Sequence, residues 1–148
     1  MITMLNGKFL LTLQHVYNAS KERVFLAWTK EEQLKQWWGI TGFTTTIEQM
    51  DVKVGGKYRF HMQAPNGNVH TLEGRYIDIV PNEKLSFTWK WINEGDDSEE
   101  TLVTIHFVEK DKKTELEMTH SAFSTMQAAK RHNKNWNNSL EGGLSNFF

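Results

Sequence analysis

Histidines are the residues of this sequence best suited to acid–base chemistry or metal binding, because imidazole titrates near neutral pH and is a common metal ligand. The chain has six of them. Alternation along the strand-like stretches places His61 and His106 on outward faces, in contact with solvent. His15, His120 and His132 could face the interior, and they are therefore the candidates for chemistry.

No catalytic motif accompanies these histidines. The chain lacks cysteine, which excludes disulfides and thiolate ligands, and it contains neither HExxH nor GxSxG. The inward strand positions carry no Asp or Glu, so paired catalytic carboxylates are not expected. His120 or His132, with Tyr58 or Tyr76 nearby, could act as a weak acid or base. The favoured interpretation is a polar group that hydrogen-bonds a ligand or water, and no metal or other cofactor is expected.

Composition narrows the classes of partner. The 17 Lys and Arg residues nearly balance 18 Asp and Glu residues and are scattered, whereas nucleic-acid binding usually needs a basic face. No nucleic-acid partner is expected. No apolar run approaches the roughly 18–20 residues of a membrane span, and the first residues lack the pattern of a signal peptide. The sequence predicts one cytoplasmic domain over residues 1–148.

Aromatic residues are the unusual feature, with six Trp and nine Phe in 148 residues. Large rings stabilise cores, but they also line apolar ligand pockets. The stretch KLSFTWKW at 84–91 alternates strictly, with Leu85, Phe87, Trp89 and Trp91 on one face. Such alternation is typical of an antiparallel sheet with one buried face.

Other stretches alternate in the same way, and turn signals such as APNGN and VPNEK separate them. A first strand is expected over 8–17, followed by about six more between 43 and 120. The inward positions expected in the other strands are Tyr58, Phe60, Met62, Val103, Ile105, Phe107, Leu116, Met118 and His120.

Helical spacing is expected in two places. Ser20 is a plausible N-cap for a helix that carries Val24, Phe25 and Trp28, and a second short helix is expected from Lys30 to Trp37 or Trp38. Adjacent helical residues diverge by about 100°, so one ring of the Trp37–Trp38 pair should anchor the helix and the other lie near its edge.

Residues 124–147 are predicted to form one long amphipathic helix, with His132, Trp136, Leu140 and Gly143 on its apolar face. The order of elements predicts an α+β fold in which a curved antiparallel sheet of about six to seven strands wraps the C-terminal helix.

Three segments follow one another along the chain: ASKERVFLAWTKEEQLKQWWG, DVKVGGKYRFHM and GRYIDIVPNEKLSFTW. Together they resemble ordered signatures of the START-like (SRPBCC, Bet v 1-like) helix-grip superfamily. Within it, the chain is most similar to the group named after the activator of the heat-shock-protein-90 ATPase. Two positions depart from it: Lys21 stands where Pro is frequent, and Asn135 precedes Trp136 where Gly is common.

The resemblance implies a cavity between the concave sheet and the last helix, in which relatives bind lipids, sterols, polyketides or aromatics. On this hypothesis a small apolar ligand would contact side chains of the sheet and helix. The apolar wall would be Phe60, Met62, Tyr76, Phe87, Trp89, Ile105, Trp136 and Leu140, and the polar contacts would come from His120, His132 and Ser139.

Ser139 and Gly143 are small residues on the inner face of the last helix. They would leave room for the ligand, or else Gly143 would allow close helix–sheet contact. In the fold implied, the first and last strands are neighbours; with residue 17 opposite about 112, His120 lies roughly 20 Å along the strands from His15. Zinc ligands lie within about 2.0–2.2 Å of one ion, so these histidines are not expected to share a metal.

Three functions follow from these observations. The first is non-catalytic binding of a small, largely apolar molecule. The second, suggested by the family's name, is a chaperone-associated or stress-response interaction module, for which the sequence offers weak support because fold does not fix function. The third is a cyclase-like enzyme acting on an apolar substrate. A homodimer through an outer helix or an edge strand is compatible with all three.

Overall fold

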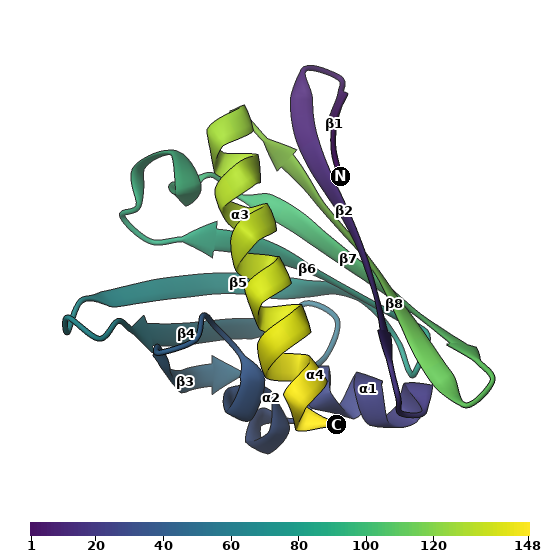
Figure 1. Ribbon diagram of the computed structural model, residues 1–148. Helices are drawn as coiled ribbons and strands as arrows, with labels where there is room; N and C mark the ends of the chain where they lie inside the picture. The colour runs from purple at the N-terminus through teal and green to yellow at the C-terminus, as the bar shows by residue number, and fades with distance from the viewer.

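A computed structural model describes residues 1–148 apart from the side chain of Asp96. One antiparallel sheet of eight strands, in the order β1-β2-β8-β7-β6-β5-β4-β3, curves around a long C-terminal helix (Figure 1). The strands are β1 (Ile2–Leu5), β2 (Lys8–Tyr17), β3 (Thr44–Met50), β4 (Lys57–Gln63), β5 (Val69–Val80), β6 (Lys84–Trp91), β7 (Thr101–Lys110) and β8 (Lys113–Phe123). The α+β helix-grip prediction is confirmed.

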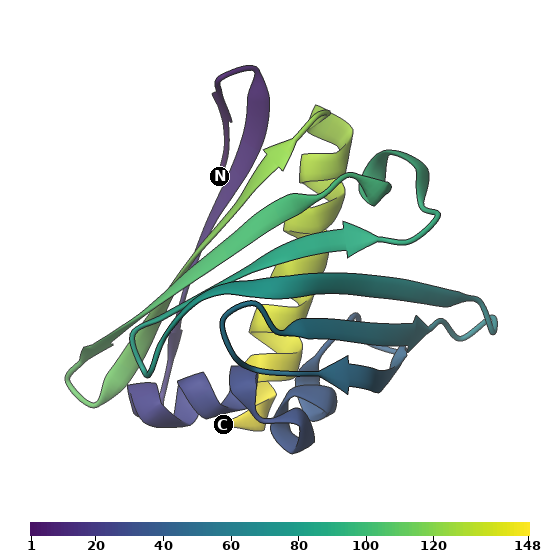
Figure 2. The ribbon, with the colours of Figure 1, turned by 180° about the vertical axis from the view of Figure 1, so that it is seen from behind.

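The strand count exceeds the prediction of six to seven because of β1, a short edge strand that pairs with β2. Asn6 and Gly7 join the two strands, and both have positive φ angles, 52° and 77°. An Asn-Gly pair in this conformation is a strong hairpin signal. Seen from behind the sheet, this hairpin projects beyond the other strands (Figure 2).

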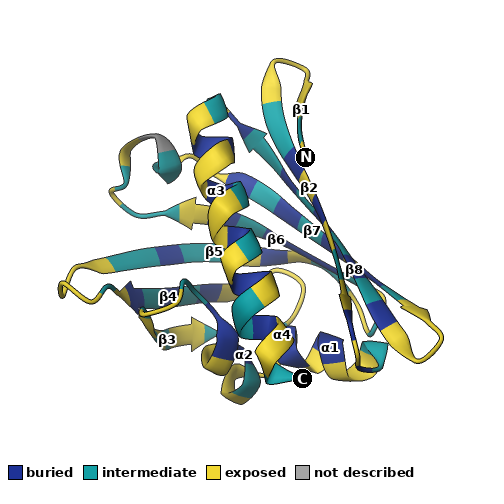
Figure 3. Ribbon diagram, in the orientation of Figure 1, coloured by how far each residue is buried: buried dark blue, intermediate teal, exposed yellow. Residues whose placement is uncertain are grey.

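The core lies on the concave face of the sheet, between the strands and the helices. Alternation along β4, β6, β7 and β8 buries one set of side chains, as the sequence predicts. Figure 3 shows this as alternating buried and exposed positions. The buried set includes Tyr58, Phe60, Met62, Leu85, Phe87, Trp89, Val103, Ile105, Phe107, Leu116, Met118 and His120.

Two short helices, α1 (Lys21–Thr29) and α2 (Glu31–Trp37), close one end of the sheet. Ser20 caps α1, as predicted, because its hydroxyl oxygen accepts a hydrogen bond from the Arg23 amide at 3.3 Å. The prediction for the tryptophan pair was wrong, since Trp37 and Trp38 are both buried. Trp38 follows the helix in an extended conformation, with φ −67° and ψ 138°, so the helical 100° step no longer separates the two rings.

The C-terminal helix crosses the concave face and consists of three segments, α3 (Met126–Asn138), the π-helical η2 (Ser139–Leu144) and α4 (Ser145–Phe147). Thr125 caps it by accepting from the Ala128 amide at 3.1 Å. The sequence predicts this helix over 124–147 but gives no sign of the π turn, which often occurs at functional sites. The loop between β6 and β7 contains a short 3-10 turn, η1 (Gly95–Ser98), near the beginning of α3 (Figure 1).

Across the described residues, no helix combines the length and the apolar character that crossing a membrane requires.

Candidate functional site

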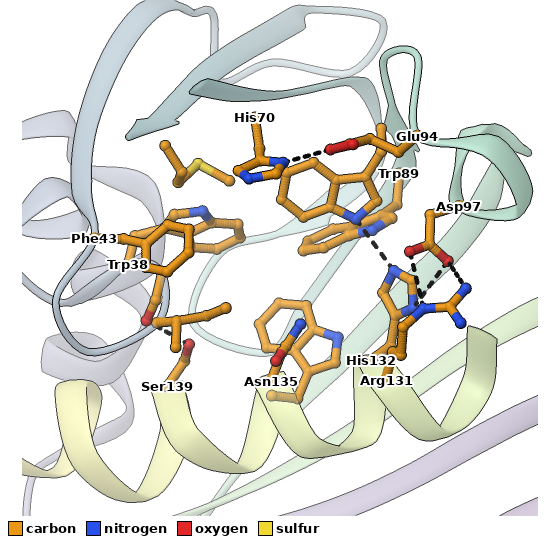
Figure 4. Close-up of a pocket in the computed structure, with 15 residues that line it drawn as sticks. Trp38, Phe43, His70, Trp89, Glu94, Asp97, Arg131, His132, Asn135 and Ser139 are labelled. Atoms are coloured by element: carbon orange, nitrogen blue, oxygen red, sulfur yellow. Dashed lines mark hydrogen bonds and ion pairs between the residues drawn. The ribbon is translucent and has the colours of Figure 1, made fainter. Parts of the chain in front are cut away.

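A cavity of about 310 Å³ lies between the concave sheet and α3 (Figure 4). The side chains of Ser139 and Asn135 rise toward it from the helix, whereas His70 and Glu94 approach from the opposite side. The cavity is lined by Trp38, Gly39, Ile40, Phe43, Met62, His70, Trp89, Trp91, Glu94, Asp97, Arg131, His132, Asn135, Trp136 and Ser139. Its volume is at the lower end of the range of roughly 300–1,000 Å³ typical of small-molecule sites.

Aromatic rings form most of its apolar wall. Trp38, Trp89 and Trp136 contact one another, with ring centroids 5.0 Å apart for Trp89 and Trp136 and 5.8 Å apart for Trp38 and Trp89. Trp91 packs edge-on against Trp89 at 5.7 Å, and Phe43 completes the wall from the loop before β3. Rings that already pack against one another form a rigid apolar surface for a flat ligand.

The loop that carries this part of the wall is tied to the C-terminal helix. Ser139 Oγ donates a hydrogen bond of 2.7 Å to the carbonyl oxygen of Gly39. One residue earlier, Asn138 Oδ1 accepts from the Thr41 amide at 3.1 Å. Ser139 therefore serves two purposes, because its small side chain leaves space in the cavity while its hydroxyl fixes the loop.

Gly143 serves a different purpose from Ser139 and does not line the cavity. A Cβ atom at this position would collide with the carbonyl oxygen of Trp37 and lie 3.3 Å from its carbonyl carbon. Gly143 thus allows the helix to approach the end of α2 closely. Of the two alternatives that the sequence leaves open for Gly143, the structure favours close contact.

His120 is fully buried and both of its ring nitrogens are engaged. Trp136 Nε1 donates to Nδ1 of His120 at 3.0 Å, so Nε2 carries the proton and lies 2.7 Å from Thr101 Oγ1. The Thr101 hydroxyl in turn donates to the carbonyl oxygen of Trp89 at 3.2 Å. Burial lowers the pKa of His120 well below its ordinary value, and the neighbouring His132 adds to the effect.

His132 is held in the same way by a second indole. Its Nδ1 donates to the carbonyl oxygen of Ala128 at 2.7 Å, and its Nε2 accepts from Trp91 Nε1 at 3.2 Å. Burial lowers the pKa of His132, although the bond to Ala128 opposes the shift. Both histidines are thus neutral and hydrogen-bonded, His132 in the wall and His120 behind it, and neither offers a lone pair to a proton or a metal ion.

The two tyrosines considered as partners in acid–base chemistry are also unsuited to it. Tyr58 donates its hydroxyl proton to the carbonyl oxygen of Thr88. Burial raises the pKa of Tyr58 well above its ordinary value, and that of Tyr76 as well. Neither phenol is placed or tuned to exchange a proton near neutral pH.

Two carboxylates, each with a close side-chain partner, stand at the polar end of the cavity (Figure 4). Glu94 Oε2 lies 2.5 Å from His70 Nδ1. Arg131 donates twice to Asp97, from Nη2 to Oδ1 at 2.8 Å and from Nε to Oδ2 at 3.2 Å. One end of the cavity is therefore aromatic, and the other presents charge.

The structure brings together five of the twelve side chains that the sequence assigns to the site, namely Met62, Trp89, His132, Trp136 and Ser139. Phe60, Tyr76 and Phe87 instead pack with Trp28 and neighbouring rings around a void of only about 10 Å³. Ile105, Leu140 and His120 are completely buried behind the wall. The predicted wall was therefore too deep, because alternation identifies inward residues but not which of them meet an open space.

Ten lining residues were not predicted. Trp91 had a signal, since it is in phase with Trp89 on an alternating strand. Arg131 and Asn135 precede predicted lining residues on the last helix. The other seven lie outside the regular part of any helix or strand. They are Trp38, Gly39, Ile40 and Phe43 between α2 and β3, His70 at the beginning of β5, and Glu94 and Asp97 between β6 and β7. Periodicity carries no information there.

His15 lies apart from these groups. The register pairs Tyr17 with Thr114 and Leu11 with His120, so the expected pairing of residue 17 with about 112 was two residues off. His15 is still four residues from the partner of His120, about 13 Å along the strand. Within the described part of the chain, no three His, Asp or Glu side chains cluster as metal ligands would.

Comparisons with known proteins agree with this architecture. A family model described as "Activator of Hsp90 ATPase homolog 1-like protein" matches residues 18–148. No curated protein is significantly similar to the chain in sequence.

Solved structures share the fold over nearly the whole chain. The crystal structure of protein CV1439 from Chromobacterium violaceum is 25% identical, with a TM-score of 0.85, and the match covers 92% of this chain and 94% of that one. The AHSA1 protein from Silicibacter pomeroyi is 24% identical with a TM-score of 0.79, over 92% and 94% of the two chains. CalU16 from Micromonospora echinospora is 20% identical with a TM-score of 0.69, over 99% and 81%.

Proposed function

The chain belongs to the Activator of Hsp90 ATPase homolog 1-like family, and from that premise we propose that it binds a small, flat, largely apolar molecule without transforming it. The observation that carries the proposal is the cavity of about 310 Å³, which is walled by four tryptophans and Phe43. A preformed apolar cavity with a few convergent polar groups is the usual form of a small-molecule site.

The volume of the cavity favours one class among the apolar ligands expected from the sequence. A volume near the minimum for small-molecule sites suits one or two fused aromatic rings better than a sterol or a lipid chain. The wall of packed rings favours the same class, because offset and edge-on ring contacts stabilise aromatic ligands beyond simple burial. A bicyclic aromatic is therefore the ligand type that we propose.

The state of the histidines supports a binding role over a cyclase-like one. His120 and His132 each donate through one ring nitrogen and accept an indole N–H at the other. Acid–base catalysis would require breaking one of these buried bonds, at a cost of about 1–3 kcal/mol per unsatisfied group. This argument leaves the histidines with a structural role in the proposal.

Equilibrium dialysis against 1-methylnaphthalene, a neutral bicyclic probe, tests the proposal. We expect saturable binding to one site per chain at micromolar concentration. Ser139→Leu, which extends a side chain into the cavity, should weaken binding at least tenfold, whereas Gly142→Ala, for which a Cβ meets nothing within 4 Å, should not. Absence of saturable binding, or equal binding by both variants, would contradict the proposal.

The family's name favours a second function, association with a chaperone ATPase. Fold and family name do not by themselves establish it. A direct measurement is the ATPase rate of an Hsp90-type chaperone with and without an excess of this chain. A reproducible increase would support the second function, and no change together with ligand binding would support the first.

A further inference from the structure

The charge of the ligand can be inferred from the polar end of the cavity. Glu94 and Asp97 both line it and are partly buried, with side chains 29% and 20% exposed. Among the described residues that line the cavity, the permanently charged basic side chain is Arg131, which is 49% exposed. Two carboxylates against one guanidinium leave a formal charge of −1 when the lining histidines are neutral.

The guanidinium of Arg131 is paired with Asp97 and not with Glu94. Arg131 donates two hydrogen bonds to Asp97, one to each carboxylate oxygen, and this bidentate arrangement offsets the charge of Asp97. Glu94 contacts His70 through Oε2 at 2.5 Å. Oε1 of Glu94 has no hydrogen-bond partner among the described residues, so this oxygen is available to a ligand.

His132 adds no positive charge next to the rings. Its Nε2 accepts the Trp91 indole proton, which requires the neutral form of the imidazole. The polar end therefore combines a wall of tryptophan rings with a carboxylate, Glu94, whose side-chain partner among the described residues is an imidazole and not a permanently charged group. Tryptophan faces attract cations more strongly than other aromatic side chains do, and the attraction grows when the cation is removed from water.

We propose that the cavity binds a small aromatic cation, a flat ring system that carries a quaternary or protonated nitrogen, with that nitrogen directed toward Glu94. The inference rests on the proposed function and specifies the ligand class of the same site. The ring system would lie among Trp38, Trp89 and Trp136, and the positive charge would meet the carboxylate where the wall ends. An anion of the same shape would meet Glu94 instead of a balancing cation and would bind least.

Three bicyclic probes of nearly equal size separate charge from shape: N-methylquinolinium (cation), 1-methylnaphthalene (neutral) and 1-naphthoate (anion). Binding is measured by equilibrium dialysis, with the absorbance of each probe as the readout. We expect the cation to bind roughly tenfold more tightly than the neutral probe, the size of a partly desolvated cation–π contact with an added ion pair. The anion should bind more weakly than both.

Glu94→Gln removes the charge and keeps the shape of the side chain. In this variant the preference for the cation should fall from about tenfold to the roughly twofold to threefold that the tryptophan faces alone supply, while the affinity for the neutral probe should stay within about twofold of the wild type. Glu100→Gln is the matched control, because Glu100 is an exposed acid of the same loop that does not line the cavity. This variant should keep the preference for the cation.

The possible failures are distinguishable. If the neutral probe binds as tightly as the cation in the wild type, the cationic ligand is ruled out. If Glu94→Gln retains the full preference, the assignment of the charge contact to Glu94 is overturned. In both cases the binding function stands. If no probe binds, both the proposed function and this inference fail.

Discussion

The concave face of the sheet has two regions that are both rich in aromatic side chains, but one is tightly packed and the other encloses a cavity. Around Trp28, Tyr58 and Phe87 the rings fill the interior and leave a void of only about 10 Å³. Around Trp89, Trp91 and Trp136 a comparable set of rings borders a cavity of about 310 Å³. Phe87 and Trp89 are two residues apart on β6 and belong to different regions.

What covers the rings explains the difference. The region around Trp28, Tyr58 and Phe87, in which the rings fill the interior, is covered by α1 and α2. Gly143 also lets the C-terminal helix approach the end of α2 closely. The hollow region is covered by the C-terminal helix, which presents Asn135 from α3 and Ser139 from the start of η2, and by the loop between β6 and β7. Aromatic content therefore does not distinguish a filled core from a cavity. The size of the opposing side chains does.

Truncating one phenylalanine in each region gives the largest predicted difference. Phe87→Ala should lower the free energy of unfolding by about 3–5 kcal/mol, since it opens a hole in close-packed rings. Phe43→Ala should cost no more than about 2 kcal/mol, because Phe43 is half-buried and already borders open space. Urea denaturation measures both variants. Equal losses would mean that the two regions are packed alike.

Adding a methyl group at the contact between the C-terminal helix and α2 tests the close approach that seals the filled region. Gly143→Ala should destabilise the fold by about 1–3 kcal/mol, because the Cβ would meet the Trp37 backbone, which has little freedom to move. Gly142→Ala, one residue earlier with free space around it, should instead stabilise by up to about 1 kcal/mol. Opposite signs in urea denaturation would confirm the contact, whereas a stabilising effect at both positions would contradict it.

Acid should weaken the fold through the histidines behind and within the cavity wall. The pKa of His120 is well below its ordinary value of 6.5 in the folded state, so the unfolded chain binds more protons as the pH falls. The contribution of His120 to the free energy of unfolding is therefore fully present above about pH 6.5 and falls as the pH is lowered from 7 to 5. His132, whose pKa is also lowered, should add to the loss.

Variants assign this dependence to the interior. Urea denaturation measures the free energy of unfolding at pH 7 and at pH 5. In His120→Gln the decrease between these two pH values should be smaller than in the wild type. His106→Gln, on the exposed face of β7, should leave the loss as it is. An unchanged slope in His120→Gln would show that the acid sensitivity arises elsewhere.

The smallest expected effect on stability comes from filling the hollow region. Ser139→Leu gains apolar burial in the cavity but loses the hydrogen bond to Gly39, so the free energy of unfolding should change by less than about 1 kcal/mol. The same variant should lose probe binding at least tenfold. Ser145→Leu is the control, because it also loses one hydroxyl hydrogen bond, to the carbonyl oxygen of Leu140 at 3.0 Å, but lies on the exposed side of the helix away from the cavity. It should leave probe binding unchanged. A loss of several kcal/mol in Ser139→Leu would mean that the cavity cannot accept a side chain.

Period-two alternation was sufficient to predict the sheet and its inward residues, because each strand of a half-buried sheet repeats the same two environments. Alternation also placed Trp89 on the inside, and helical periodicity did the same for Trp136; both line the cavity. The β1 strand was missed although Leu5-Asn6-Gly7-Lys8 carried a hairpin signal. Four residues are too few to show a period.

The candidate site was harder to predict than the fold, because it depends on distances between elements. Gly143 and Ser139 are both small residues on one helix, yet one contacts backbone and the other borders empty space. Trp38 could not be placed while it was counted as helical, since the chain becomes extended at that residue. Glu94 and Asp97 are in a loop, where no periodic pattern exists to indicate direction.

The contacts among the tryptophans have an optical consequence. All six indoles of the chain form one connected series, from Trp37 through Trp28, Trp38, Trp136 and Trp89 to Trp91, with neighbouring centroids no more than 5.9 Å apart. At such separations excitation passes readily between rings, so the protein should absorb and emit as one coupled chromophore. A molecule bound beside Trp91 would then alter the fluorescence and the near-ultraviolet circular dichroism of the whole series, and the chain carries its own reporter for the cavity.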